Sequence, residues 1–497
     1  MLVRTLKRNP DHAKLKPQPG QHGPQMKIKK LLITLTIGVI LLGACAAPAP
    51  STPAPSAPSI APVLPSPEPP KTSTTLTPTP TPTPSPTTPP SDTTPPSAIT
   101  GLIANNAYDN RINLWWDKST AEDFDHYNIY ITKAEMTDVT SIQPIQQIED
   151  INTLKYQATE LEDGIKYYIA IAAVDKSGNE NMQVASASAT PSPMPRGTVD
   201  PDLRIDIYQS DMSWIGTTIL ADNHNLQRRR IIEINMLGEI VWEYVVTGVP
   251  QNSFVEAQLL PNNNILYTVS EKGVYEVDRS GKIVWSYLTS KIDHDAQRLP
   301  NGDTIFVFGM NDQKSDAQVV EVNTNGEVVW SWYAKDYFDK APYADISDAG
   351  WTHTNAVIRL SNGNTLISLR NFDMVAEVDP QGAIVRTIGE GTLIQVHGPE
   401  ILANGNIVAA LPNTQTLRAI EIDSNSGAVV WQFNWEGDAG ARDANRLPNG
   451  NTLVVGLTKI VEVTNEGEIV WQLSLTADIG QDKRLQGFYK ADRISPD

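Results

Sequence analysis

The C-terminal part of the chain repeats an Asn-Gly pair, and polar side chains stand at a fixed distance before it. His294, Asn355, His397 and Arg442 each lie eight residues before the glycine of such a pair. His353 lies two residues before Asn355, so the two-residue period of a strand predicts that both side chains share one face. Because these positions begin equivalent strands, we expect their side chains to converge at one end of a central channel.

Arg370 is expected to join this group. With Asn362-Gly363 as a two-residue hairpin turn, Asn355 pairs across the strands with Arg370. Three histidines, an asparagine and an arginine offer many hydrogen-bond donors, and such a set suits a compact oxyanion such as sulfate or phosphate. A neutral histidine nitrogen can also act as a nucleophile while neighbouring donors stabilise charge on the transferred group.

A second repeated element predicts the architecture that positions these residues. A glycine followed by a short apolar strand and a tryptophan recurs at Gly238–Trp242, Gly281–Trp285, Gly326–Trp330, Gly427–Trp431 and Gly467–Trp471. A sixth copy, Gly382–Arg386, has lost its tryptophan. The Asn-Gly pairs, which we interpret as type I′ turns, recur at the length of four-stranded propeller blades. We interpret the tryptophans as structural, packing one blade against the next.

The first repeat supplies only three strands, at 217–221, 230–234 and 239–242, and the C-terminal segment Phe488–Ile494 resembles the missing inner strand. If this last strand completes the first blade, the ring closes and loses its open edge. The predicted fold class is therefore all-β, with a six-bladed β-propeller over residues 204–497 whose C-terminal strand closes the first blade.

Residues 95–192 predict a separate small β-sandwich, because short alternating strands and turn signals fill the segment. Trp116, the segment Leu161–Tyr167 and the segment Ala173–Asn179 resemble the buried tryptophan, the tyrosine corner and the F–G loop of a fibronectin type III module. The resemblance implies a spacer or docking module, and no chemistry follows from it.

Residues 1–45 have the features of a signal peptide, with Met26 as the better start. The apolar run from Leu31 to Leu42 is too short to span a membrane comfortably. Leu42–Cys45 resembles a bacterial lipoprotein lipobox, which implies lipidation of Cys45 and anchoring to the cell membrane on its extracytoplasmic side. An ordinary secretory signal with an incidental cysteine is the alternative. Residues 46–94 hold most of a run of 19 prolines between Pro48 and Pro96 and predict an extended, disordered linker.

The charge and the cysteine count exclude several classes of protein. A formal net charge of −18 without a basic stripe argues against a nucleic-acid partner. A single cysteine excludes both an internal disulfide scaffold and a Cys-based zinc knuckle.

The propeller region resembles the arylsulfotransferase family of bacterial periplasmic enzymes. The matching segments are His294–Gly302, Trp351–Val357 with Ser368–Arg370, and Val396-His397 leading to Asn404–Asn406. The resemblance implies that a small-molecule aryl sulfate gives its sulfuryl group to a phenol without a cofactor, through a sulfohistidine on His397. It also implies four sulfate-binding residues, which are His294, His353, Asn355 and Arg370. An aspartate after the nucleophile would match the family better than Gly398 does.

Other functions stay open on the residues alone. A non-catalytic propeller carrying a fibronectin-like module could be a surface protein that binds a peptide, a glycan or a small anion. Three histidines could ligate zinc or iron, but Arg370 and the scarcity of carboxylates, Asp295 and Glu400 apart, disfavour a metal there. Histidines at strand starts could also merely bind channel waters.

The connection 331–351 and His224 are two further features of the propeller region. The long connection 331–351 is rich in aromatic residues, Tyr333, Tyr337, Phe338, Tyr343 and Trp351 among them, and is expected to be either an aromatic lid over the histidines or a plain surface loop. His224 is expected at the surface or at the rim of the channel.

Overall fold

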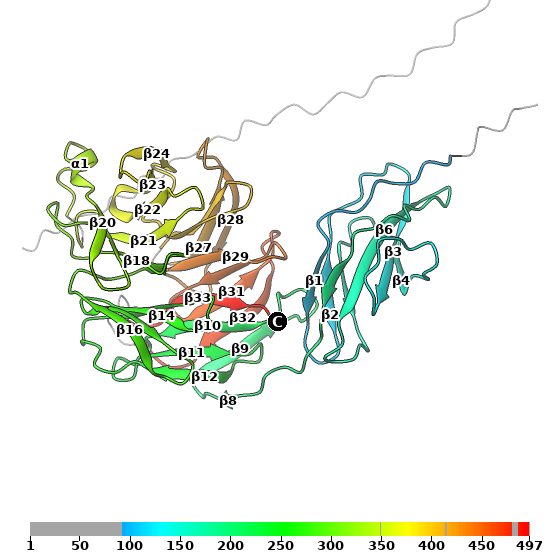
Figure 1. The fold of residues 1–497 in the computed structure, drawn as a ribbon, viewed down its shortest axis with the longest axis horizontal. Coiled ribbons are helices and arrows are strands. Elements are labelled where there is room, and N and C mark those ends of the chain that lie inside the picture. Colours follow the sequence, from blue (N-terminus) through cyan, green and yellow to red (C-terminus); the bar gives the residue numbers. More distant parts are fainter. Residues whose placement is uncertain (1–91, 348, 413–414, 480–485, 497) are drawn as a thin grey trace, which may run out of the picture. The chain divides into compact units, whose positions relative to one another are not determined.

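The computed structural model describes residues 92–347, 349–412, 415–479 and 486–496, which are almost entirely β-structure (Figure 1). The predicted signal peptide, Cys45 and the linker up to residue 91 lie outside the described residues. Within those ranges the helical elements are one short α-helix, α1 (Lys335–Phe338), and one 3₁₀ turn, η1 (Arg370–Phe372). No described helix has the length and apolar character needed to cross a membrane. The all-β prediction is therefore confirmed.

The segment 103–189 forms two antiparallel sheets. The first has the order β1 (Ile103–Asn106), β2 (Ile112–Trp115), β5 (Lys155–Ala158), and the second has the order β4 (Gln146–Ile148), β3 (Phe124–Thr132), β6 (Tyr167–Asp175), β7 (Ala187–Ala189). Trp116 is buried with its ring 5.6 Å from that of Tyr127. The Tyr167 hydroxyl accepts a hydrogen bond from the Glu162 amide at 3.0 Å, as in a tyrosine corner.

The remaining chain forms six antiparallel sheets, here called I to VI. Sheet I is β33 (Phe488–Ile494), β10 (Thr217–Asp222), β11 (Arg230–Ile234), β12 (Glu239–Val245) and β8 (Thr198–Val199). Sheets II and III are β13 (Val255–Leu259), β14 (Ile265–Val269), β15 (Gly273–Val277), β16 (Ile283–Leu288), and β17 (Ala296–Arg298), β18 (Thr304–Val307), β19 (Val319–Val322), β20 (Val328–Trp332). Sheets IV and V are β21 (Thr354–Arg359), β22 (Thr365–Leu369), β23 (Met374–Val378), β24 (Ile384–Ile388), and β25 (His397–Ile401), β26 (Ile407–Ala410), β27 (Leu417–Ile422), β28 (Val429–Trp435). Sheet VI is β29 (Asp443–Arg446), β30 (Thr452–Val455), β31 (Lys459–Val463), β32 (Ile469–Leu475) and β9 (Leu203–Tyr208).

Hydrogen bonds join the first strand of each sheet to the next sheet in cyclic order. From sheet I to sheet II the Asp492 carboxylate accepts from the Leu259 amide. Gln258 of sheet II donates to the Ala296 carbonyl of sheet III, and the Val357 amide of sheet IV donates to Asp295 of sheet III. Asn355 of sheet IV donates to the Val396 carbonyl beside sheet V, and the Arg446 amide of sheet VI donates to Glu400 of sheet V. Asn445 of sheet VI donates to the Ala491 carbonyl of sheet I. Because this last bond reaches β33 of sheet I, the six inner strands follow one another around a common centre.

Tryptophans, four of them from the repeated motif, connect the same sheets farther out. In five sheets an indole N–H donates to a backbone carbonyl in the turn before the fourth strand of the next sheet. These bonds run from Trp242 to Arg279, Trp285 to Thr324, Trp332 to Gly382, Trp431 to Asn465, and Trp471 to Met236. Arg386, which stands where the sixth tryptophan is missing, donates to the Ser424 carbonyl of sheet V. Four of the five repeated tryptophans therefore connect neighbouring sheets as the repeats predicted. In sheet III the corresponding bond is made by Trp332, two residues after the repeated Trp330.

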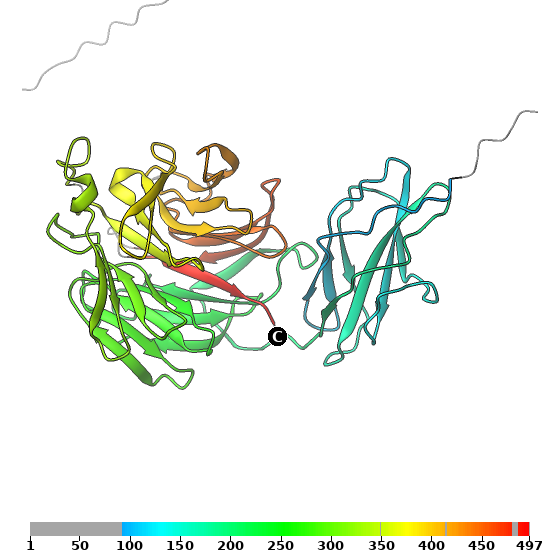
Figure 2. The ribbon, with the colours of Figure 1, turned by 45° about the horizontal axis from the view of Figure 1, so that its top comes forward.

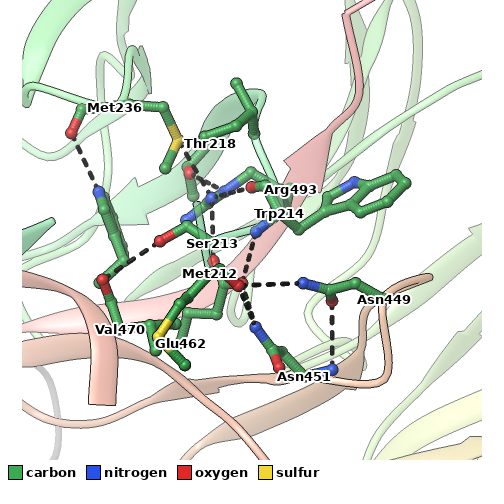
Figure 3. Close-up of polar contacts among 12 residues, drawn as sticks. Met212, Ser213, Trp214, Thr218, Met236, Asn449, Asn451, Glu462, Val470 and Arg493 are labelled. Atoms are coloured by element: carbon green, nitrogen blue, oxygen red, sulfur yellow. Dashed lines mark hydrogen bonds and ion pairs between the residues drawn. The ribbon is translucent and has the colours of Figure 1, made fainter. Parts of the chain in front are cut away.

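The C-terminal strand lies in the first sheet, beside β10, as the red and green ribbons show (Figures 1 and 2). Arg493 of β33 pairs with Glu462 of β31, in sheet VI, at 3.3 Å, and both side chains are completely buried. Glu462 also accepts from the Trp214 amide and from Asn451, while Arg493 donates to Thr218 (Figure 3). This network ties both ends of the six-sheet region together.

The hairpin turns differ from the predicted type. In Asn362-Gly363 only the glycine has a positive φ, +88°, and its amide donates to the Leu360 carbonyl. Leu360 then pairs with Asn364, which is the pattern of a type I turn followed by a left-handed glycine. Asn362 does not need a positive φ because its side-chain oxygen caps the Asn364 amide at 2.9 Å. The prediction of a two-residue type I′ turn is therefore wrong.

Candidate active site

Three imidazoles meet where the innermost strands of sheets III, IV and V begin. His294 lies two residues before β17, His353 directly precedes β21, and His397 is the first residue of β25. The His294 ring centroid lies 5.5 Å from that of His353 and 5.7 Å from that of His397. A single small ligand can therefore touch all three rings.

His397 is held by its backbone, and its ring is available for chemistry. Neither ring nitrogen has a hydrogen-bond partner among the described residues. Burial lowers the pKa of His397 well below its usual 6.5, and the positive charges of His294, Arg370 and Arg442 lower it further. At neutral pH this imidazole is therefore uncharged, with a lone pair on one nitrogen, as a nucleophile requires.

His294 has the opposite electrostatic setting. Burial alone would lower its pKa, but the Glu256 carboxylate, 2.8 Å from Nδ1, and the nearby Asp293 raise it above 6.5. Its Nε2 is buried without a hydrogen-bond partner among the described residues. The ring also packs on Phe254, with centroids 4.8 Å apart. The contact with Glu256 therefore favours the protonated ring of His294 and holds it in a fixed orientation.

His353 reaches the cluster by a route that differs from the predicted one. It lies outside β21 and has a left-handed backbone, with φ +49°. The two-residue strand period therefore does not apply between His353 and Asn355, and the prediction of a shared strand face is wrong. The Ala349 carbonyl accepts from Nδ1–H at 2.7 Å, so the neutral ring leaves a lone pair on Nε2. Burial, His294 and Arg370 lower its pKa well below 6.5.

Asn355 does not pair with Arg370, because the hairpin register differs from the predicted one by one position and a bulge follows Thr354. Asn355 instead accepts from the Ser368 hydroxyl at 2.5 Å and donates to the Val396 carbonyl at 3.0 Å. Arg370 lies beyond β22 in η1 and donates to Asn371 and Gln395. Its charge still acts on His353 and His397, whose pKa values it lowers.

A second arginine, Arg442, lies at the start of sheet VI and is held by residues of sheet I. Arg442 directly precedes β29 and donates to the Gln486 and Phe488 carbonyls at 2.9 and 2.8 Å. Its guanidinium lies 3.8 Å from the centroid of the Tyr489 ring. Tyr489 in turn stacks on Phe254, the residue that supports His294. Tyr489 and Phe254 therefore connect the guanidinium of Arg442 to the ring of His294 by stacked aromatic side chains.

Acidic side chains form a separate layer one residue further along the inner strands. Asp295 pairs with Lys490, and Asp443 accepts from Asn445 at 2.9 Å. Burial raises the pKa of Asp443 to about 7. Asp443 Oδ1 also fills the space where a Cβ on Gly398 would lie, and Gly398 has φ +47°. Within this layer the charge of Asp295 is therefore compensated by Lys490.

The donor set of the cluster suits an anion. The pKa of His294 is raised by Glu256 and Asp293, whereas burial, together with the charges of His294 and Arg370, lowers the pKa values of His353 and His397. Arg442 lowers the pKa of His397 further. Among the described residues, the acidic and histidine side chains close enough to share one metal ion are Asp92, Asp123 and Asp175, in and next to the sandwich. Asp175 is already engaged by the Ser177 and Asn179 amides. The geometry therefore favours a bound oxyanion at the histidines, with a neutral nucleophile beside it.

The Arylsulfotransferase (ASST) family model matches residues 207–397. This range contains His294, His353, Asn355 and Arg370 and ends on His397. No curated protein matches the chain.

Similar solved structures share little sequence with the chain. A protein of unknown function from Bacteroides caccae is 20% identical, with 52% of this chain and 94% of that chain covered and a TM-score of 0.40. Virginiamycin B lyase from Staphylococcus aureus is 12% identical, with 63% and 92% covered and a TM-score of 0.35. BamB from Moraxella catarrhalis is 13% identical, with 65% and 87% covered and a TM-score of 0.28.

The aromatic residues of the connection 331–351 pack mainly on one another and on η1. Phe338, Tyr343 and Trp351 surround Phe372, with ring centroids 4.8 to 5.5 Å from it. Tyr337 stacks on Trp332. These aromatic side chains pack into a small local core. Their contacts favour the expectation of a surface connection over that of a lid on the histidines.

His224 lies away from the histidine cluster. Its Nδ1 bonds Asp222 at 2.7 Å, and Asp202 lies 3.5 Å from Nε2. Its pKa is raised because Asp222 and Asp202 outweigh the effect of burial.

Glu256 is a residue of the site that the sequence pattern did not predict. The pattern used the position eight before each turn, whereas Glu256 stands seven before Asn263, which has φ +65° in place of the turn glycine. Asp295 and Asp443 occupy the same position in their own repeats. Extending the register by one residue would have identified all three carboxylates.

Proposed function

We propose that the chain is an aryl-sulfate sulfotransferase that carries the sulfuryl group on His397. The carrying observation is a neutral imidazole, unpartnered among the described residues, beside the cationic His294, Arg370 and Arg442. The ASST match over residues 207–397 supports the same class of reaction. The cationic groups would bind the sulfuryl oxygens, and His397 would attack the sulfur.

In the first half-reaction a lone pair of His397 attacks the sulfur of an aryl sulfate. The bond from sulfur to the aryl oxygen breaks, and that oxygen leaves with the electron pair and takes a proton from water. His294, Arg370 and Arg442 stabilise the negative charge on the sulfuryl oxygens in the transition state. The product is a phenol, and the enzyme holds an N–S bond on His397.

In the second half-reaction the oxygen of an acceptor phenol attacks the sulfur and the N–S bond breaks. The electron pair returns to His397, and the phenol must lose its proton. His353 suits this step because its Nε2 lone pair is available while Nδ1–H is held by Ala349. Neutral His353 cannot donate from Nε2 to a sulfuryl oxygen, so we assign it proton transfer rather than sulfate binding.

The architecture belongs to the same proposal. We interpret sheets I to VI as the six blades of a β-propeller, and the two sheets of residues 103–189 as a fibronectin type III module. The cyclic bonds between inner strands and between tryptophans and neighbouring turns support the propeller. We further propose that Cys45 is lipidated and anchors the folded part outside the cytoplasmic membrane through the linker 46–94.

The direct test is transfer from 4-nitrophenyl sulfate to phenol by the purified chain. We expect release of 4-nitrophenol with formation of phenyl sulfate, and loss of both in His397→Ala. His224→Ala is the matched control, because it removes a partly buried histidine outside the cluster. Failure of the wild type with a broad panel of aryl sulfates would overturn the proposal. Binding of inorganic sulfate without any transfer would instead favour a non-catalytic anion-binding protein.

A further inference from the structure

Glu256 lies on β13, in the sheet next to the one that carries His294. Its Oε1 is 2.8 Å from His294 Nδ1, and the two residues are 7% and 5% exposed. Carboxylates and imidazoles both lose favourable hydration on burial, so an ion pair in this position must be held by good geometry. Here the Thr268 hydroxyl fixes the His294 carbonyl at 2.6 Å, and Phe254 packs on the ring.

The other charged groups around His294 come from several elements. Asp293 and Asp295 flank it in the chain, while His353, Arg370 and His397 face it from sheets IV and V. Arg442 of sheet VI and Lys490 of sheet I are cations that interact electrostatically with Glu256. Glu256 is the acidic group that makes the short contact with the His294 ring. Without it, the facing cations would oppose a charge on His294.

We propose that Glu256 is a positioning residue of this site: its carboxylate holds the second proton on the His294 ring. The buried Nε2–H is then a permanent donor to the oxyanion, and the positive ring keeps His397 an uncharged nucleophile. One carboxylate on a neighbouring sheet would thus favour the charged form of His294 and add to the effect of burial and Arg370, which favour the neutral forms of His353 and His397. The catalytic role of Glu256 rests on the proposed transfer reaction, whereas its effect on the protonation of His294 does not depend on that reaction.

The electrostatic part can be measured on the wild-type chain without any activity. With ¹⁵N-labelled histidine, NMR titration of the rings gives each pKa after assignment with single His→Gln variants. We expect the pKa of His294 to lie above 6.5, and to fall by about one pH unit or more in Glu256→Gln. Glu276→Gln is the matched control, since Glu276 is a buried carboxylate of the same sheet that pairs with Arg298 rather than with a histidine. An unchanged His294 titration in Glu256→Gln would overturn the proposal.

The catalytic part has a pH signature that a merely structural role would not produce. In Glu256→Gln, His294 loses its proton at lower pH and His397 gains one at higher pH. Both limbs of the kcat/KM profile should therefore move inward, and activity above neutral pH should fall about tenfold for each pH unit by which the alkaline limb moves. A uniform loss of activity with both limbs unmoved would contradict the proposal. Glu276→Gln should keep the wild-type profile.

Binding of inorganic sulfate separates this inference from the proposed function. We expect Glu256→Gln to bind sulfate more weakly than wild type at about pH 7.5, and lowering the pH to about 5.5 to restore binding by protonating His294. If the chain transfers no sulfuryl group but these changes occur, the transferase proposal fails and the role of Glu256 stands. If transfer occurs but sulfate binding in Glu256→Gln shows no pH rescue, the role of Glu256 fails alone.

Discussion

The Asp443 carboxylate on β29 occupies the space that a side chain at position 398 would need, directly after His397. Gly398 therefore does two things at once. It adopts a left-handed φ of +47°, and it lets an acidic group from the neighbouring sheet approach the backbone of the proposed nucleophile. The absence of a side chain at this position is a packing requirement of the site.

Gly398→Ala should destabilise the fold and reduce transfer. The added Cβ would overlap Asp443 Oδ1, and the left-handed backbone costs about 1–2 kcal/mol for a residue other than glycine. We expect a total loss of about 2–4 kcal/mol in urea unfolding. Asp443→Ala should relieve the overlap but not the backbone strain, so the double variant should recover part of the loss. Wild-type stability in Gly398→Ala would contradict this packing.

Arg493→Met should destabilise the six-sheet region strongly. The substitution leaves Glu462 buried without its cation, and breaking a buried pair in this way costs about 3–5 kcal/mol. Lys133→Met provides the control, because the Lys133–Glu162 pair is exposed and contributes little to stability. Equal urea midpoints for the two variants would show that the pair between β31 and β33 does not stabilise the six-sheet region.

The two neutral histidines should make stability depend on pH. Because the folded-state pKa values of His353 and His397 are depressed, their contribution to stability is complete above about pH 6.5 and is lost as the pH falls. Each should cost up to about 1.4 kcal/mol per pH unit below that value. His294 has a raised pKa and acts in the opposite sense, losing its contribution as the pH rises through that pKa. Urea unfolding at about pH 7.5 and about pH 5.5 should show a smaller acid loss in His353→Gln/His397→Gln than in wild type. An equal loss would mean that these rings are already protonated.

The regular part of the fold was predictable because each repeat carries local signals. The strand Phe488–Ile494 was predicted with its observed bounds, since it repeats the pattern of the inner strands. The glycine that precedes each tryptophan motif likewise marked the turn before each outer strand. Such features depend on local turn chemistry and strand alternation, which a sequence displays directly.

The details of the site were less predictable because they depend on irregular backbone. A type I turn with a left-handed glycine and a bulge after Thr354 each change the register, so Asn355 meets Ser368 rather than Arg370. His353 enters the cluster from a left-handed residue outside any strand. Glu256 belongs to a different sheet from the histidine it pairs with, so its place in the repeat register does not by itself reveal the contact with His294.

Isolation of the covalent intermediate would show whether His397 carries the sulfuryl group. The full chain is mixed with 4-nitrophenyl sulfate in the absence of any phenol acceptor, digested at alkaline pH, and analysed by tandem mass spectrometry. We expect one added SO₃ group on the peptide containing His397, lost on addition of phenol and absent from His397→Ala. A sulfuryl group on another residue, or efficient transfer with no covalent intermediate on His397, would contradict this expectation.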